Sequence, residues 1–258
     1  MNRKLCTAAF LLLAITGCKQ SQSTADTSAA TKPPEPTYFK VDTATAGTVT
    51  GTVKYEGAKP KPKLIDMSSD PACAKAHKGG KVEDASLLVD KKGDLANAFV
   101  YISKGLEGKA FATPTDSVTI DQSGCWFEPR VLGLQTGQTL DIVNSDPVTH
   151  NIHPMPHDNR EWNHSQGPGD PPMHRKFTKA EVMIPVKCNI HDWMHAFIGV
   201  VDHPYFAVTG DDGTFKLPNL PPGTYTVTAW HENMEPVETT VTIAPSRKAE
   251  ANLTFHAK

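Results

Sequence analysis

From residue 48 onward the sequence is a series of short runs rich in β-branched and aromatic residues, separated by glycine, proline, asparagine and aspartate. Such runs predict β-strands, and the residues between them predict turns. Long amphipathic helical patterns are absent from this part of the sequence. The pattern predicts an all-β protein, most simply two β-sandwich units. The runs cover residues 48–55, 96–102, 117–120, 126–143 (two strands flanking Thr136 and Gly137), 181–186, 196–201, 206–209, 214–217, 224–230, 237–243 and 251–255.

Residues 1–17 have the pattern of an export signal, with a basic head followed by an apolar run over residues 5–15. That run is shorter than the roughly 20 residues that span a bilayer. Ile15-Thr16-Gly17-Cys18 resembles the bacterial lipobox, which implies a lipid-anchored protein with acylated Cys18 as its first residue. The expected location is the periplasmic side of a bacterial membrane, with the outer membrane slightly favoured by Lys19, or the cell surface. An ordinary signal peptide and an uncleaved anchor stay open as alternatives.

Residues 18–47 are rich in Ser, Thr, Ala and Pro, with few large apolar side chains. A segment of this composition cannot bury enough surface to fold, so it is expected to be a disordered tether. The whole chain has a formal net charge of −2. No basic patch is evident, so a nucleic-acid partner is not expected.

The five cysteines fall into three groups. Cys6 lies in the signal and Cys18 in the lipobox. Cys73 and Cys125 can form a disulfide in an oxidising compartment, with two free thiols or a metal role as alternatives. Cys188 has no partner left, so a lone thiol in an exported protein needs another explanation. No Cys-x-x-Cys-His motif occurs, which excludes covalent c-type haem.

The stretch CNIHDWM places Cys188, His191 and Met194 at intervals of three. Blue-copper centres use two imidazoles and one thiolate near a plane, with a weak axial ligand that is often a thioether. The stretch supplies one ligand of each kind, and a second histidine must come from elsewhere. His150, in NSDPVTHNIH after the strand predicted near residues 139–143, is the best candidate.

These residues resemble the cupredoxins, over about residues 124–202. The spacing of the Cys-His-Met loop is similar to that of amicyanin, and GQTLDIVNSDPVTHNIH is similar to plastocyanin and amicyanin. The resemblance implies one type 1 copper ion with His150, Cys188 and His191 as equatorial ligands and Met194 as the axial ligand. It also implies that Asn151 fixes the ligand loop from just outside the coordination shell.

Some features depart from a minimal cupredoxin. A histidine-rich insert, residues 155–179, lengthens the interval between His150 and Cys188. His153 is the main rival to His150, and His153 and His195 are candidates for an additional metal site. Zinc is an alternative to copper, although a thioether is a poor zinc ligand.

The C-terminal sequence resembles the carboxypeptidase regulatory-like, or transthyretin-like, β-sandwich, on the motifs AVTGDDGTF and LPPGTYTVTAW. TVTGTVKYEG near the start resembles the first strand of the same fold. The expected organisation is an N-terminal β segment at 48–110, a Greek-key cupredoxin domain at 111–203 and a small sandwich at 204–258. The N-terminal segment is expected to pair with the C-terminal sandwich, with the cupredoxin unit inserted into it or packed against it.

The expected function is a membrane-anchored carrier of single electrons, with a cytochrome or a periplasmic oxidoreductase as its partner. A copper storage or delivery lipoprotein and a metal-free structural lipoprotein are the alternatives. An enzyme is not expected, because no second copper centre can be assembled and no Ser-His-Asp set, P-loop or dinucleotide motif stands out.

Overall fold

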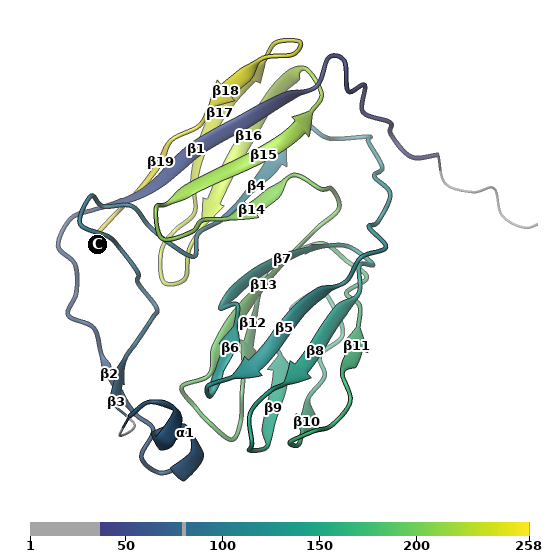
Figure 1. Ribbon diagram of the computed structural model, residues 1–258. Helices are drawn as coiled ribbons and strands as arrows, with labels where there is room; N and C mark the ends of the chain where they lie inside the picture. Colours follow the sequence, from purple (N-terminus) through teal and green to yellow (C-terminus); the bar gives the residue numbers. More distant parts are fainter. Residues whose placement is uncertain (1–36, 79–80, 258) are drawn as a thin grey trace, which may run out of the picture. The chain divides into compact units, whose positions relative to one another are not determined.

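The computed structural model describes residues 37–78 and 81–257 (Figure 1). This part of the chain forms nineteen β-strands and one short α-helix, so the predicted all-β class is confirmed. Most strands form two sandwiches. We call them the terminal sandwich, which uses both ends of the described chain, and the central sandwich, which lies between them in sequence. The lipobox and Cys18 lie outside the described residues.

The terminal sandwich consists of two four-stranded sheets. One has the order β15-β1-β18 with β19 also paired to β1, and the other has the order β14-β4-β16-β17. β1 pairs antiparallel with β15 and parallel with β18 and β19, for example Val53 with Leu253. The strands are β1 (Gly47–Glu56), β4 (Phe99–Lys104), β14 (Phe206–Val208), β15 (Thr214–Leu220), β16 (Gly223–Trp230), β17 (Val237–Ile243), β18 (Lys248–Glu250) and β19 (Leu253–His256).

Alternation of apolar residues explains the core of this sandwich. In β1, Val49, Val53 and Tyr55 are buried, and in β19 Leu253 and Phe255 are buried. Successive strand residues point to opposite faces, so these side chains share the inner face. Together with apolar residues of the other strands they form one continuous core cluster.

The central sandwich has a five-stranded sheet of order β10-β9-β12-β13-β7 and a four-stranded sheet of order β11-β8-β5-β6. Its core contains Ile120, Leu134, Leu140, Ile142 and Ile152, all fully or nearly fully buried. The strands are β5 (Val118–Ser123), β6 (Trp126–Glu128), β7 (Val131–Gln135), β8 (Leu140–Asn144), β9 (His150–Pro154), β10 (His164–Gln166), β11 (Met173–Arg175), β12 (Glu181–Lys187) and β13 (His195–Val201).

Two glycines of the central sandwich admit aromatic rings from the terminal sandwich. A Cβ atom added to Gly199 in β13 would lie 2.5 Å from the ring of Phe99, and one added to Gly133 in β7 would lie 2.5 Å from the ring of Phe206. Such distances are too short for any side chain. Glycine at these positions therefore lets Phe99 and Phe206 pack directly on the strand backbones.

The segment before β4 contains the helix. It runs through β2 (Leu64–Asp66), α1 (Pro71–Ala76) and β3 (Lys81–Glu83), with β2 paired to β3. Asp70 is the N-cap of α1 and Pro71 its first residue, the arrangement that the start of a helix favours. Cys73 of α1 forms the predicted disulfide with Cys125. The disulfide therefore ties this segment, which we call the cover, to the central sandwich.

Some strands differ from the sequence-based expectation. Residues 126–143 contribute to three strands, β6, β7 and β8, because Pro129, which lacks an N–H group, interrupts the pairing. The histidine-rich insert is not wholly irregular, since β10 pairs with β9 and β11 pairs with β8 at the sheet edges. β9, β18 and the β2–β3 pair were not predicted as strands.

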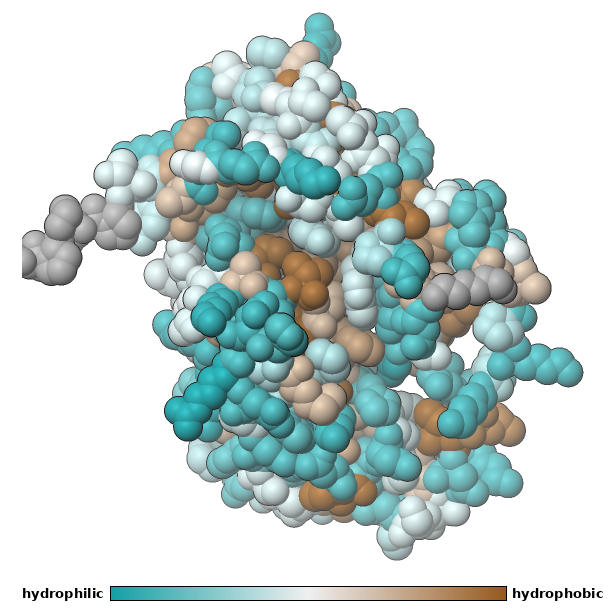
Figure 2. Space-filling view, turned by 180° about the vertical axis from the view of Figure 1, so that it is seen from behind, coloured by the Kyte–Doolittle hydropathy of each residue, from teal (hydrophilic) through white to brown (hydrophobic). Residues whose placement is uncertain are grey.

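Exposed apolar surface is limited. On the face shown in Figure 2, hydrophilic and neutral residues predominate and hydrophobic residues form small, separate patches. Within the described ranges, the large apolar side chains that are exposed are Tyr38, Leu64, Leu88, Val182 and Ile190. None of the helices in these ranges is long and apolar enough to cross a membrane.

Candidate metal centre

Two loops at one end of the central sandwich carry the predicted ligands. His150 begins β9, directly after the turn that follows β8. Cys188, His191 and Met194 lie in the connection between β12 and β13, which is closed by a bond from the Cys188 N–H to the Met194 carbonyl at 3.1 Å. The β9 and β12 strands pair antiparallel, so the two loops meet at the same end of the sheet.

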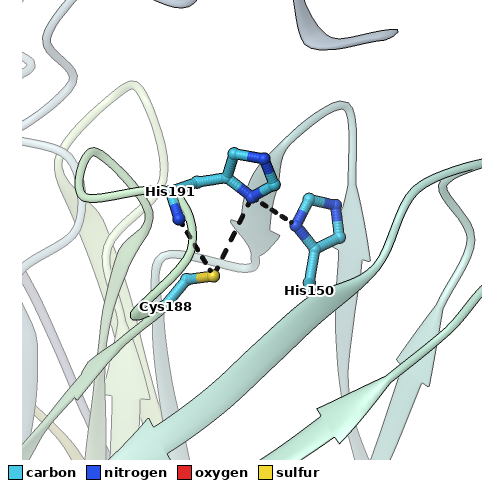
Figure 3. Close-up of side chains that lie close together, drawn as sticks. All are labelled: His150, Cys188 and His191. Atoms are coloured by element: carbon cyan, nitrogen blue, oxygen red, sulfur yellow. Dashed lines mark hydrogen bonds between the residues drawn. The ribbon is translucent and has the colours of Figure 1, made fainter. Parts of the chain in front are cut away.

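His150, Cys188 and His191 point toward one another, as Figure 3 shows. The Nδ1 atoms of the two histidines are 2.9 Å apart, and His191 Nδ1 is 3.9 Å from Cys188 Sγ. One donor atom from each of the three residues lies within 4.8 Å of the others. All three side chains are buried, as is Met194 in the adjoining core. The structure thus brings together a thiol and two imidazoles that are all shielded from solvent.

Backbone N–H groups surround the sulfur of Cys188. The N–H groups of Ile190 and His191 point at Sγ from 3.4 Å, and the N–H of Asn151 points at it from 3.5 Å. Hydrogen bonds to the charged form of a group favour that form. The loop therefore directs three backbone donors at the sulfur of Cys188.

Asn151 links the two loops. Its Oδ1 accepts the N–H of Asn189 at 2.6 Å and lies 3.3 Å from Cys188 Sγ, while its Nδ2 donates to Asn163 at 2.6 Å. This side chain therefore fixes the start of the ligand loop against β9. The contacts are of the kind that the cupredoxin resemblance implies for Asn151.

Each histidine has a carboxylate at its outer nitrogen. His150 Nε2 is 2.8 Å from Asp146 Oδ2, and His191 Nε2 is 3.2 Å from Asp70 Oδ2. Burial lowers the pKa of His150 below its ordinary value, although the hydrogen bond to Asp146 acts in the opposite direction. Partial burial acts to raise the pKa of Asp70, but bonds from the Cys73 N–H, His191 and the Ala72 N–H outweigh it and leave that pKa below its usual value.

In this arrangement the Nδ1 atoms of His150 and His191 face each other, and neither carries a hydrogen. An ionised carboxylate only accepts hydrogen bonds, so each Nε2 carries the proton of its neutral ring. Both Nδ1 atoms then present electron pairs across 2.9 Å in a buried pocket. A cation between them removes the repulsion, so this donor set fits a metal ion.

Two other groups of potential ligands overlap this one. Asp70 and Cys73 lie near His191, and Cys125 and Asp146 lie near His150. Cys73 and Cys125 are joined in the disulfide and so offer no thiolate. Among the described residues, neither His153 nor His195 belongs to a group of three or more potential ligands.

His153 and His195, the other candidate metal ligands, make different contacts. His153 contacts Glu161 at 2.6 Å and Asn189 at 3.4 Å, while His195 is exposed. These contacts do not bring His153 and His195, the candidates for an additional metal site, into one group of ligands. The Trp193 ring lies 5.1 Å from the His191 ring and shields it on one side.

The sequence analysis did not identify Asp146 and Asp70, whose carboxylates contact the outer nitrogens of the two histidines. Asp146 precedes His150 by four residues, so its position in the turn after β8 was a readable signal. Asp70 followed by Pro71 is a recognisable helix start, but its contact with His191 joins residues 121 positions apart. Nothing local in the sequence indicates that contact.

Comparison with known proteins agrees with the predicted resemblance of the C-terminal sequence. Residues 196–256 match the model of the carboxypeptidase regulatory-like domain. The matched segment starts within β13 and includes β14 to β19, while β1 and β4, which complete the terminal sandwich, lie outside it. No curated protein matches the chain.

Several solved structures of copper proteins resemble part of the chain in fold. A Cu-containing nitrite reductase from Thermus scotoductus SA-01 is 23% identical over 39% of this chain and 25% of its own, with a TM-score of 0.32. A purple cupredoxin from Nitrosopumilus maritimus is 21% identical over 33% of this chain and 99% of its own, with a TM-score of 0.28. Amicyanin from Paracoccus versutus is 17% identical over 39% of this chain and 96% of its own, with a TM-score of 0.30.

Proposed function

We propose that the protein is a type 1 copper protein that carries single electrons. The observation that supports this most directly is the convergence of Cys188 Sγ with the Nδ1 atoms of His150 and His191 in a buried pocket. In this proposal these three residues and Met194 would hold the ion. Bound copper would supply a one-electron couple.

The donor set favours copper over zinc. Thiolate and thioether are soft ligands, which copper prefers, whereas structural zinc sites use Cys and His in a tetrahedral shell. The bonds of Asn151 and the N–H groups around Cys188 Sγ hold the ligands in one arrangement. A fixed ligand set suits electron transfer, because the protein then reorganises little when the ion changes charge.

The burial of the ligands favours a carrier over a catalyst. A catalytic metal centre keeps an open position for substrate, while His150, Cys188 and His191 are each at most 3% exposed. We therefore propose that the partner is another redox protein, such as a cytochrome or a periplasmic oxidoreductase. The N-terminal sequence supports a lipid anchor at Cys18 on the periplasmic side of a bacterial membrane, which intact-mass measurement of the exported protein would test.

The copper proposal is tested by spectroscopy of the full chain loaded with copper. A single equivalent that gives intense visible absorption and a narrow-splitting paramagnetic resonance signal, with reversible reduction, would support an electron carrier. Colourless, exchangeable copper at more than one equivalent would indicate storage or delivery instead. A protein that binds no copper would contradict the proposal.

A further inference from the structure

The outer edge of His191 is closed by the cover. Ile190, the preceding residue, is 52% exposed, yet His191 is only 3% exposed. Asp70 at the start of α1 contacts the outer nitrogen of the ring, and Trp193 lies against the ring itself. A segment remote in sequence and a ring of the same loop therefore both contact the imidazole of His191.

The cover is fixed in place by several independent contacts. The Cys73–Cys125 disulfide lies in an apolar cluster with Met67, and Trp126 and Trp193 pack on that cluster. His77, just after α1, contacts the Gly124 carbonyl at 2.5 Å. These contacts leave little freedom for Asp70 to move away from His191.

The two oxygens of Asp70 have separate partners. Oδ1 accepts the N–H groups of Ala72 at 2.8 Å and Cys73 at 3.1 Å, which is the usual role of a helix N-cap. Oδ2 is left to face His191 Nε2 at 3.2 Å. The helix cap thus fixes the orientation of the carboxylate and aims one oxygen at the imidazole.

We propose that Asp70 is a positioning residue for the metal ligand His191, delivered to the site by the disulfide-anchored cover. By holding the proton on Nε2, Asp70 keeps the Nδ1 electron pair directed at Cys188 and His150. A carboxylate bonded to the outer nitrogen of a ligand histidine fixes the form and orientation of the ring. The ring orientation is inferred from the structure alone, while its importance for metal binding rests on the proposed function.

The decisive variant is Asp70→Asn, because asparagine caps a helix as well as aspartate does. Its amide oxygen will stay with the two backbone N–H groups, so its NH₂ group will face His191 Nε2. Two donors cannot bond to each other, so the proton of His191 should move to Nδ1, where it blocks metal binding. Nitrogen-15 NMR of the imidazole in the metal-free full chain detects this change, and we expect copper affinity to fall about 10-fold.

Asp66→Asn is the matched control. Asp66 is an exposed carboxylate of the same cover that accepts the N–H of Ser68 at 2.9 Å. The exchange removes the same charge without touching His191, so ring protonation and copper affinity should stay as in the parent protein. Asp70→Ser is a second variant, since serine also caps helices but is too short to reach the ring. It removes the acceptor from Nε2 without placing a donor there, so it should release the proton and weaken copper binding less than Asp70→Asn does.

The outcomes separate this inference from the copper proposal. An Nδ1 proton in D70N but not in D66N supports the positioning role, even if no variant binds copper and the proposed function fails. An Nε2 proton and parent-like copper affinity in D70N would overturn the positioning role while leaving the copper proposal intact. Equal effects of D70N and D66N would also overturn it, because they would reflect charge alone.

Discussion

The two sandwiches bury very different side chains. The main core cluster of the terminal sandwich is apolar, with the hydroxyls of Tyr205 and Tyr225 bonded to backbone carbonyls, and this sandwich buries few other polar side chains, such as Thr209. The ligand end of the central sandwich instead buries polar groups, among them Asn144, Asn151 and Gln166. Burying polar groups costs free energy unless each has a partner. The two regions therefore differ in how their interiors are held, by apolar packing in one and largely by hydrogen-bonded polar side chains in the other.

The polar groups behind the ligands form a connected network. Asn144 donates to the carbonyls of Val148 at 2.9 Å and Gln166 at 2.8 Å, and its Oδ1 accepts the N–H of Asp146 at 3.0 Å. Asp146 in turn contacts His150. The turn that presents His150 is therefore held by side-chain hydrogen bonds as well as by the packing of Val148 on the cluster around the disulfide.

The largest expected effect is at the ligand end. Replacing Cys188 by Ser removes the proposed thiolate, so the charge-transfer absorption of the copper-loaded protein should disappear completely. Visible spectroscopy measures this change. Survival of the colour in the variant would show that another residue supplies the sulfur or that the ligand assignment is wrong.

Shortening a core side chain of the terminal sandwich should have the opposite effect: it should lower stability and leave the copper spectrum unchanged. Phe255 is 1% exposed in the apolar core, and Phe→Ala changes in cores cost about 3–5 kcal/mol. The free energy of unfolding of Phe255→Ala, measured by denaturant titration, should fall by about that amount. Its copper spectrum should match that of the parent, and a changed spectrum would show that the two regions are coupled.

Asn144→Ala and Thr209→Val compare buried polar groups in the two regions. Thr209 Oγ1 donates to the Leu95 carbonyl at 2.7 Å and accepts the Ala98 N–H at 2.9 Å in the terminal sandwich. Leaving buried partners unpaired costs about 1–3 kcal/mol, so both variants should lose stability on that scale. Copper affinity should fall only in Asn144→Ala. Equal copper affinities would contradict a supporting role for the network.

The smallest expected effect is a pH dependence in the terminal sandwich. His203 Nε2 donates to the Ile102 carbonyl at 2.9 Å, and Nδ1 accepts the Tyr205 N–H at 3.2 Å, so the folded state uses the neutral ring. Burial lowers the pKa of His203. Above the unfolded-state pKa of about 6.5 its contribution to stability is fully present, and it is lost as pH falls toward the folded-state pKa.

His203→Gln tests this dependence. The variant should lose less stability than the parent when metal-free protein is taken from pH 7.5 to pH 5.5, as measured by thermal unfolding. His231 stays in both proteins, and burial also lowers its pKa, so part of the acid sensitivity should remain. An identical pH dependence in parent and variant would exclude His203 as its source.

Much of the fold followed from alternation of apolar residues, as in β1 and β16. The proposed ligands could be picked out because Cys188 and His191 share one loop and His150 follows a clear strand. The edge strands β10 and β11 were missed because they are three residues long and lie among prolines and histidines. The role of Asp70 could not be predicted, since it depends on how the cover packs and not on any local pattern.

The pairing of β1 with β19 has a consequence for how the chain folds. Val53 and Leu253 are brought together only when nearly the whole described chain has been synthesised. All strands of the central sandwich precede β14 in the chain, so they are complete before the terminal sandwich can close. Contacts between such distant residues form slowly. During synthesis, the edge of β1 that pairs with β18 and β19 therefore has no partner strand when the strands that carry the proposed ligands can already assemble.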